Sequence, residues 1–396
     1  MNSSILPLLE RPNSKQPFST VPPKPANMKR VLISVGTRPN FIKITQFRRV
    51  AAERGDLEVR IVHTGQHYDR FMSSVFFEQF NLQPDFFLSL EALTPAAQVG
   101  EMVTKLAELM DAYEPDMVIT PGDVNSTLAA AIACNKMGIP LAHLESGLRS
   151  FDRSMPEEIN RLLTDEISDL FFVTEQSGMN NLKTEGKSMD YAYLVGNTMI
   201  DTLVAFEPQI DASDILEKCG VTAGNFALMT MHRPATVDNP NGLDFITRVV
   251  EGVTAEHPLV FPIHPRTKAK FESFGKWEEF KATAGLILTE PLDYYAFQKL
   301  IRDASFILTD SGGIQEESTF RQVPCFTLRA NTERPITCTL GTNELVELDA
   351  DVVLSKIARA SEKTGQIPQH WDGKSTERIM DHVATYLGLP VSNAKA

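Results

Sequence analysis

Short, almost wholly apolar runs recur along this chain and alternate with longer stretches that have helical patterning. In the first half they are RVLISVG (30–36), LEVRIVHTG (57–65), DMVITPGD (116–123), LAHLESG (141–147), LFFVTE (170–175) and YAYLVGN (191–197). In the second half they are FALMTMH (226–232), LVFPIH (259–264), LILTE (286–290), FILTD (306–310) and PCFTL (324–328). Strands with such sequences belong to parallel sheets covered by helices on both faces. Two series of this kind, joined near residues 200–215, predict an α/β protein with two doubly wound Rossmann-like domains.

The pattern also predicts where the domains begin and end. Residues 1–27 are rich in Pro and Ser and lack periodicity, so we expect a disordered tail, and Met28 is an alternative start of the protein. The tail has no charged segment followed by a long apolar one and is therefore not a secretory signal. We expect an N-terminal domain at 28–205 and a C-terminal domain at 206–374. Residues 375–396 would form a helix, able to return to the N-terminal domain, and a short tail.

Composition and missing motifs exclude several classes of protein. The 396 residues carry a formal net charge of −13, which argues against binding to nucleic acid or to a membrane surface, and no apolar run is long enough to span a membrane. No GxGxxG follows the first strand and no GxxxxGK[ST] occurs, which argues against dinucleotide and P-loop sites. The histidines and the four separated cysteines show no metal-ligand spacing. We therefore expect a cytoplasmic protein with no metal and no cofactor.

A glycine turn in TDSGGIQEES (309–318) is the sharpest chemical feature. It directly follows a predicted strand and precedes a helix, so Ser311, Gly312 and Gly313 would offer free N–H groups to a phosphate. Glu317, one turn into the helix, would accept hydrogen bonds from ribose hydroxyls. The alternative is an ordinary strand–turn–helix in which Asp310 or Ser311 is the N-cap.

Charged side chains follow other strands at the same predicted edge, where doubly wound domains bind their ligands. Arg38 and Lys43 stand in GTRPNFIK (36–43), although Lys43 alone could lie on a solvated helix face.

Carboxylates gather at this edge as well. Asp123 and Glu145 end two strands and Glu157 opens a helix; Asp123 could instead be an N-cap and Glu157 a partner of the helix dipole. Glu145 ends an apolar run, where a carboxylate is costly unless it is paired or used. Converging carboxylates suit general acid–base chemistry. His232 and His264 follow strands of the second half and would face the same crevice, although each alone could be structural.

The motifs, taken in order, resemble those of the non-hydrolysing UDP-N-acetylglucosamine 2-epimerase family over about residues 28–388. The matching segments are GTRPNFIK, TGQHYD, GDVNST, HLESGLRS, MPEEINR, VGNTMID, MHRPATVDN, FPIHPRT, LTDSGGIQEES and TERPIT. The resemblance implies a fold similar to glycosyltransferase-B and commonly a homodimer. It also implies elimination and re-addition of UDP through a 2-acetamidoglucal, without a metal or nicotinamide. It assigns catalysis to Arg38, Lys43, Asp123, Glu145, Glu157 and His232, and UDP contacts to Arg38, His264, Ser311, Gly312, Gly313, Glu317 and Arg334.

Departures from the family pattern bear on the substrate and on regulation. Asn40 and Ala235 stand where many members have Glu, and Gln66-His67-Tyr68-Asp69 differs from the segment that helps bind an activating UDP-sugar in bacterial members. The resemblance therefore leaves open a related substrate such as UDP-2,3-diacetamido-glucuronate, and a hydrolysing epimerase that releases N-acetylmannosamine. A glycosyltransferase of the same fold and a non-enzymatic nucleotide-sugar binder rank lower.

Overall fold

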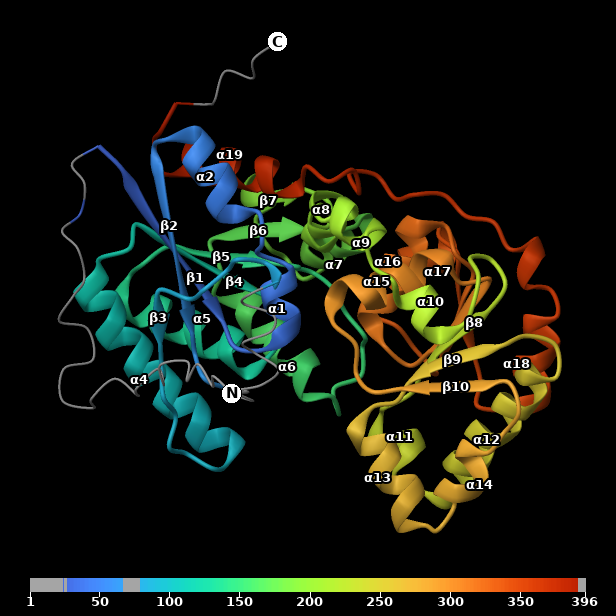
Figure 1. Cartoon of the computed structure of the whole chain (residues 1–396). Helices are drawn as coiled ribbons and strands as arrows, with labels where there is room; N and C mark the ends of the chain where they lie inside the picture. Colours follow the sequence, from blue (N-terminus) through green and yellow to red (C-terminus); the bar gives the residue numbers. More distant parts are fainter. Residues whose placement is uncertain (1–23, 25–26, 67–78, 391–396) are drawn as a thin grey trace, which may run out of the picture.

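The computed structural model describes residue 24 and residues 27–66 and 79–390, and these form two parallel sheets, each covered by helices (Figure 1). Most of the expected tail, together with His67 and Asp69, lies outside the described residues. The two sheets confirm the expectation of two doubly wound α/β domains. Among the described residues, no helix is long and apolar enough to cross a membrane.

The first sheet has seven strands in the order β3-β2-β1-β4-β5-β6-β7. Its strands are β1 Lys29–Val35, β2 Leu57–His63, β3 Phe86–Phe87, β4 Met117–Pro121, β5 Leu141–Leu144, β6 Leu170–Val173 and β7 Ala192–Leu194. Its helices are α1 Arg38–Ile42, α2 Phe47–Arg54, α4 Pro95–Tyr113, α5 Asn125–Met137, α6 Pro156–Glu166, α7 Gln176–Thr184, η1 Met189–Tyr191 and α8 Thr198–Ala205.

The second sheet has six strands in the order β10-β9-β8-β11-β12-β13. They are β8 Ala227–Thr230, β9 Leu259–Pro262, β10 Leu286–Thr289, β11 Phe306–Thr309, β12 Cys325–Leu328 and β13 Asn343–Val346. The helices that lead to it and surround it are α9 Glu207–Asp211, α10 Ile215–Cys219, α11 Pro234–Val237, α12 Pro240–Thr254, α13 Pro265–Ser273, α14 Trp277–Lys281, α15 Tyr294–Asp303, α16 Gly312–Arg321, α17 Ile336–Thr339, α18 Ala350–Ile357 and η2 Ala360–Glu362. The last helix, α19 Ser375–Tyr386, belongs with the first sheet.

Burial on both faces explains why the strands are so apolar. In β1, Val31 and Ile33 belong to the core on one side of the first sheet, while Leu32 belongs to the core on the other side with residues of α4 and α5. Successive side chains of a strand point to opposite faces, so a strand buried on both faces has no polar positions to alternate with. The elements with the strongest apolar runs therefore lie at the centre of each sheet.

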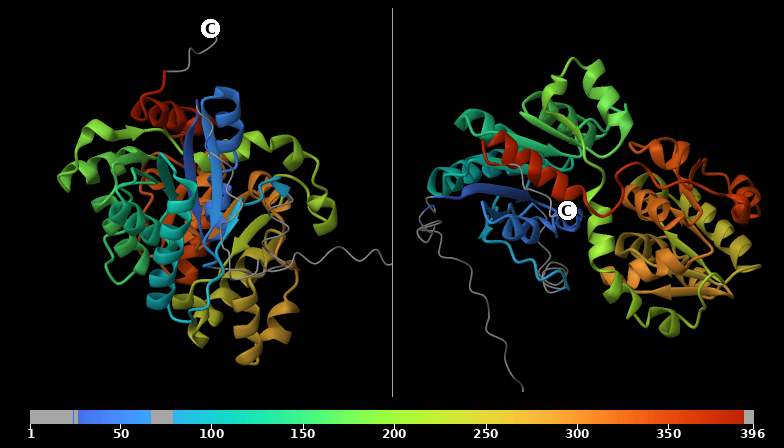
Figure 2. Two further views of the ribbon diagram at one scale, coloured as in Figure 1. Left: turned by 90° about the vertical axis from the view of Figure 1, so that its left-hand side faces the viewer. Right: turned by 90° about the horizontal axis from the view of Figure 1, so that it is seen from above.

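The chain crosses between the two sheets twice. It passes from α8 through α9 and α10 to the second sheet, and after α18 it runs back so that α19 packs on α2 and α8 (Figures 1 and 2). Trp371, only 2% exposed, belongs to the core of the first sheet and its indole N–H donates to the Thr174 carbonyl. Two carboxyl oxygens of Asp201 accept the backbone N–H groups of Ser375 and Thr376, which secures the start of α19.

Several strands end earlier than the apolar runs suggest, and two strands were not anticipated. β5 stops at Leu144 because Glu145 and Gly147 have φ values of 75° and 76°, which extended strands cannot hold. β3 has two residues only, and β13 reads NELV, half polar because it is the outermost strand of its sheet. Edge strands with such sequences carry no apolar run by which to predict them.

Candidate functional site

A buried ion pair lies where β1, β4 and β5 end. Lys43 caps the C-terminus of α1, and its Nζ lies 2.8 Å from Oε2 of Glu145. Both side chains are almost wholly buried, so the alternative of a solvated face for Lys43 is wrong. The other oxygen, Oε1 of Glu145, is buried and accepts no hydrogen bond from the described residues. A carboxylate oxygen in that state is costly unless a ligand uses it.

Asp123 lies beside this pair, in the turn that follows β4. Its Oδ2 accepts from Nε and Nη2 of Arg161 at 2.9 and 2.6 Å. The N-cap of α5 is Val124, so the alternative reading of Asp123 as an N-cap is wrong. A Cβ added to Gly122 would stand 3.1 Å from Nζ of Lys43 and 4.0 Å from Oε2 of Glu145. The residue directly before Asp123 therefore lies against the ion pair.

The two glutamates of MPEEINR behave differently. Glu158 is buried, and its carboxylate accepts the backbone N–H groups of Ser150 and Phe151 and pairs with Arg161. Glu157, in the same first turn of α6, is half-buried. Glu158 thus anchors the loop before α6. Of the two glutamates, Glu157 is the more accessible.

Asn40 connects the loops after β1 and β4. Its Oδ1 accepts the backbone N–H of Thr37 at 3.2 Å, and its Nδ2 donates to the Pro121 carbonyl at 3.1 Å. An ionised Glu at this position could not donate to that carbonyl. The departure from the family pattern noted in the sequence therefore has a structural role in holding two strand ends together.

The second sheet contributes a histidine pair. Nδ1 of His232 lies 2.8 Å from Oδ1 of Asp310, whose other oxygen accepts the backbone N–H groups of His232 and Arg233. Burial acts to raise the pKa of Asp310, but these hydrogen bonds outweigh it and hold the pKa below its usual range. Asp310 thus orients His232 rather than capping α16. The rings of His232 and His264 have centroids 5.3 Å apart.

The glycine turn lies at the end of β11, where α16 begins at Gly312. Ser311 is the N-cap and makes no side-chain capping bond. The first N–H groups of a helix have no intrahelical partner, so they face outward at this end. A Cβ at Gly312 would come within 2.8 Å of Oε1 of Glu333, whereas one at Gly313 would meet only Cε of Met199 at 3.4 Å. Gly313 therefore has more open space than Gly312.

The charges of Glu317 and Arg38, which come from different domains, act on each other. Burial raises the pKa of Glu317 to about 8, and the charge of Arg38 is among those opposing the rise. Burial likewise lowers the pKa of Arg38 to about 10, against the charges of Asp293 and Glu317. Each group thereby favours the charged form of the other.

Arg334 is buried between the domains. It pairs with Glu333 and with Glu316, whose Oε2 lies 2.6 Å from its Nε, and its Nη2 lies 3.9 Å from Oε2 of Glu145. Burial raises the pKa of Glu316 to about 7, and the charge of Glu145 adds to the rise while Arg334 opposes it. Arg334 thus links the carboxylates of both domains.

Comparisons with known proteins agree on one family. The family model described as UDP-N-acetylglucosamine 2-epimerase matches residues 49–384. The UDP-N-acetylglucosamine 2-epimerase of Methanocaldococcus jannaschii is 37% identical over 371 residues, covering 90% of this chain and 99% of that protein. The chain belongs to this family.

A solved structure and one further relative agree with this family. The crystal structure of the M. jannaschii UDP-GlcNAc 2-epimerase in complex with UDP-GlcNAc and UDP has a TM-score of 0.80 at 36% identity, covering 90% of this chain and 99% of that one. The UDP-2,3-diacetamido-2,3-dideoxy-D-glucuronate 2-epimerase of Pseudomonas aeruginosa is 35% identical over 363 residues, covering 90% of this chain and 99% of that protein. The resemblance read from the motifs is thereby confirmed.

Sequence reasoning missed several residues that support the epimerase site. Glu316 and Glu333 flank predicted residues, and burial raises the pKa of Glu175, which follows β6, to about 7. His143 holds the Asp123 turn from β5, beside Arg161 of α6, which the MPEEINR motif already places in this region. Glu316 and Arg161 stand within quoted motifs, so their positions were visible, but their partners come from segments distant in sequence.

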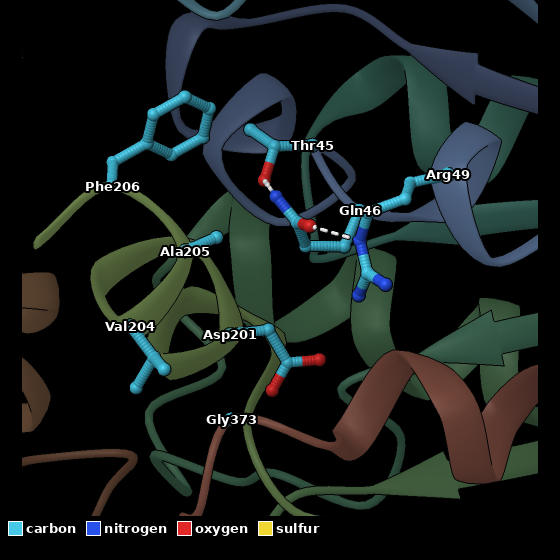
Figure 3. A pocket seen from close by; sticks show the side chains of 8 residues that line it. All are labelled: Thr45, Gln46, Arg49, Asp201, Val204, Ala205, Phe206 and Gly373. Atoms are coloured by element: carbon cyan, nitrogen blue, oxygen red, sulfur yellow. Dashed lines mark hydrogen bonds between the residues drawn. The ribbon is translucent and has the colours of Figure 1, made fainter.

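A surface pocket of about 470 Å³ lies apart from this set (Figure 3). It is bordered by α2, α8 and the segment before α19 and includes none of the predicted site residues. Its lining residues are Thr45, Gln46, Arg49, Asp201, Val204, Ala205, Phe206 and Gly373. Among the described residues, no group of three or more His, Cys, Asp or Glu side chains is placed to hold a metal ion.

Proposed function

We propose that this protein is a UDP-N-acetylglucosamine 2-epimerase that interconverts UDP-N-acetylglucosamine and UDP-N-acetylmannosamine. The observation that carries the proposal is the buried Lys43–Glu145 pair beside Asp123, placed across the domain interface from the α16 turn. Proton transfer at carbon needs a carboxylate, and departure of a diphosphate needs hydrogen-bond donors and cations. Both must lie in one crevice.

The two domains divide the work. Ser311, Gly312 and Gly313, with the free N–H groups of α16, hold the diphosphate, and Glu317 takes the ribose hydroxyls. A carboxyl group with a pKa of about 8 is neutral at pH 7, so Glu317 both donates and accepts. His264 and Arg38 add donors around the phosphates, and Arg334 supports the site through its carboxylate partners.

The sugar lies against the first domain, where the acid–base groups are. A carboxylate among Asp123, Glu145 and Glu157 removes the C2 proton while the C1–O bond breaks and UDP leaves with the electron pair. Lys43, Arg38 and His232 stabilise the charge that develops on the departing diphosphate. UDP then adds back to C1 of the 2-acetamidoglucal as C2 is reprotonated on the opposite face. No atom is gained or lost, and the sequence of steps is an isomerisation.

A second substrate has support from one comparison. The P. aeruginosa relative named for UDP-2,3-diacetamido-2,3-dideoxy-D-glucuronate is 35% identical, close to the 37% of the M. jannaschii enzyme. The chemistry at C1 and C2 is the same for both sugars. Side-by-side assays with the two UDP-sugars decide which one this site prefers.

The experiment that tests the proposal is incubation with UDP-N-acetylglucosamine in deuterated water. We expect deuterium at C2 in both epimers with the UDP-sugar retained, and the Glu145→Gln variant serves as the matched control. Free N-acetylmannosamine would indicate a hydrolysing epimerase, and absence of both would contradict the proposal.

We also propose a cytoplasmic homodimer, since the substrate is a nucleotide sugar and family resemblance implies a dimer. Light scattering coupled to size-exclusion chromatography is expected to give twice the mass of the chain. A monomer at micromolar concentration would contradict the dimer.

A further inference from the structure

The turn that carries Asp123 is held at three successive carbonyl groups. The Pro121 carbonyl accepts from Nδ2 of Asn40 at 3.1 Å and the Asp123 carbonyl from Nδ2 of Asn160 at 2.9 Å. Between them, the Gly122 carbonyl lies 2.8 Å from Nε2 of His143. Each of the three carbonyls is therefore held by a side chain from a different element.

His143 differs from Asn40 and Asn160 because its side chain can carry a positive charge. Its second ring nitrogen, Nδ1, lies 2.6 Å from Oδ1 of Asp165, and both side chains are fully buried. A carbonyl oxygen only accepts, and an ionised carboxylate only accepts. The other oxygen of Asp165, Oδ2, accepts from Nη2 of Arg149 at 2.7 Å and from the backbone N–H of Gly147 at 3.0 Å, and the pairing with this permanent cation keeps Asp165 ionised. Both ring nitrogens of His143 thus face acceptors.

We propose that His143 is a buried imidazolium that acts as a positioning residue for Asp123. Donation from both nitrogens requires a proton on each, and the positive charge is balanced by Asp165 on one side. On the other side the ring draws the Gly122 carbonyl inward. Gly122 has a φ of 72° and its N–H donates to the Leu144 carbonyl at 2.9 Å, while its own carbonyl is held by the His143 ring. The kinetic part of this inference rests on the proposed epimerase function.

The surroundings of the ring support a charged state. Nη2 of Arg149 lies 2.7 Å from Oδ2 of Asp165, and the same guanidinium also pairs with Glu185. Glu185 therefore balances the charge of Arg149. Beyond Gly122 lies the Lys43–Glu145 pair, which is internally balanced. Asp165 therefore remains available as the counter-ion of His143.

His63 provides an internal comparison. It is also buried, but its Nδ1 accepts the backbone N–H of Gly65 at 2.9 Å and can hold no proton. Its ring therefore carries one proton at most and is neutral. Among the described histidines, the doubly protonated, solvent-protected ring would be that of His143.

The first test is nitrogen-15 NMR of histidine-labelled wild-type protein at pH 7.5. We expect one imidazole with two N–H protons protected from exchange, missing from the spectrum of His143→Gln. A neutral ring for His143 would overturn the proposal whether or not the protein is an epimerase. His63 marks the neutral buried state in the same spectrum, and His143→Gln assigns the signal of the charged ring.

The second test separates positioning from folding by kinetics. In His143→Asn the shorter amide does not reach the Gly122 carbonyl, and we expect kcat to fall roughly 10- to 100-fold because a catalytic group is misplaced. The KM and the Kd for UDP should change less than about twofold. His143→Gln, whose amide reaches the position of Nε2, should recover most of the loss. Unchanged kcat in a folded His143→Asn protein would overturn the proposal, and so would a loss of UDP affinity as large as the loss of kcat. Inactivity of the wild-type protein would instead refute the epimerase assignment.

Discussion

Individual charged residues in this protein are buried in pairs, and the pairs concentrate where the strands of the first sheet end. Lys43 and Glu145 lie 2.8 Å apart with almost no exposure. Removing one partner of such a pair leaves an uncompensated buried charge, which costs several kcal/mol. The energetic cost of the arrangement argues for a chemical use, because an apolar pair of similar volume would be at least as stable.

At the residue scale we predict that Asp123→Asn and Glu145→Gln each lower turnover by about a hundredfold or more, the scale for loss of a general acid or base. UDP should still bind to both variants, because the groups proposed to hold it lie mainly in the second domain. Steady-state kinetics and calorimetric titration of UDP measure the two quantities.

The matched control is Glu166→Gln, an exposed glutamate on α6 of the same domain that pairs only with Lys187 among the described residues. It should keep wild-type rates. Near-normal turnover in both Asp123→Asn and Glu145→Gln would remove these carboxylates from the mechanism.

Helix α16 combines two properties that seldom occur in one element. Its N-terminus is a glycine turn at the domain interface, and its interior buries Glu316 and Glu317. Burial raises the pKa values of these carboxyl groups to about 7 and about 8. The helix therefore presents free N–H groups at one end and carboxyl groups that are easily protonated in its middle.

The first prediction for α16 concerns Gly313. Gly313→Val should lower the affinity for UDP at least tenfold, because a side chain would block the close approach of a diphosphate to the helix N-terminus. The melting temperature should change little, because a Cβ there meets only Met199 at 3.4 Å.

Gly100 in α4 supplies the control, since a Cβ there meets nothing within 4 Å. Gly100→Val should leave UDP affinity unchanged. Unaltered UDP affinity in a well-folded Gly313→Val protein would reject the phosphate cradle.

The second prediction for α16 concerns pH. The pKa of Glu317 is raised, so the folded state holds a proton that the unfolded state has lost, and stability falls as pH rises from about 4.5 to about 8. Glu317→Gln removes this loss, so its melting temperature relative to wild type should be a few degrees higher at pH 9 than at pH 6.

Glu207→Gln is the control of opposite sign. Burial acts to raise the pKa of Glu207, but Arg321 and Arg302 lower it below its usual range. The stabilisation by Glu207 is complete above pH 5, so its variant should be destabilised equally at pH 6 and pH 9. A constant difference between Glu317→Gln and wild type would show that Glu317 is ionised in the fold.

The whole molecule is two α/β domains tied together by two chain crossings and by a buried charge network. The second crossing places Trp371 and α19 in the core of the first domain (Figure 2). Arg334 links Glu316 and Glu333 to Glu145 across the interface.

At this scale we predict that a chain beginning at Met28 keeps full activity and melts within about 3 °C of the full chain. The deletion removes the ion pair of Lys24 with Asp116, but Asp116 keeps the backbone N–H of Arg30 and the side chain of Lys29 as partners. A partly exposed pair contributes at most about 1 kcal/mol. Lys24→Ala isolates that contribution, and a much larger fall for the shortened chain alone would show that other tail residues pack on the body.

The sequence by itself determined the fold class, the family and most of the strand positions. Apolar runs that must be buried on both faces can only be parallel strands, and glycines and charges placed directly after them mark the ligand-binding edge. These signals are local in the chain. They predicted Lys43, Glu145 and the α16 turn from residue type and position alone.

Only the tertiary structure decided which charges meet. His143 and Asp165 lie 22 residues apart, and Arg334 reaches Glu145 from the other domain. Their pairing depends on sheet order and on the approach of the domains, which no short pattern encodes. The family resemblance assigns Arg334 to UDP contacts, but only the fold shows that it is also buried among carboxylates, because burial and electrostatics are properties of the assembled molecule.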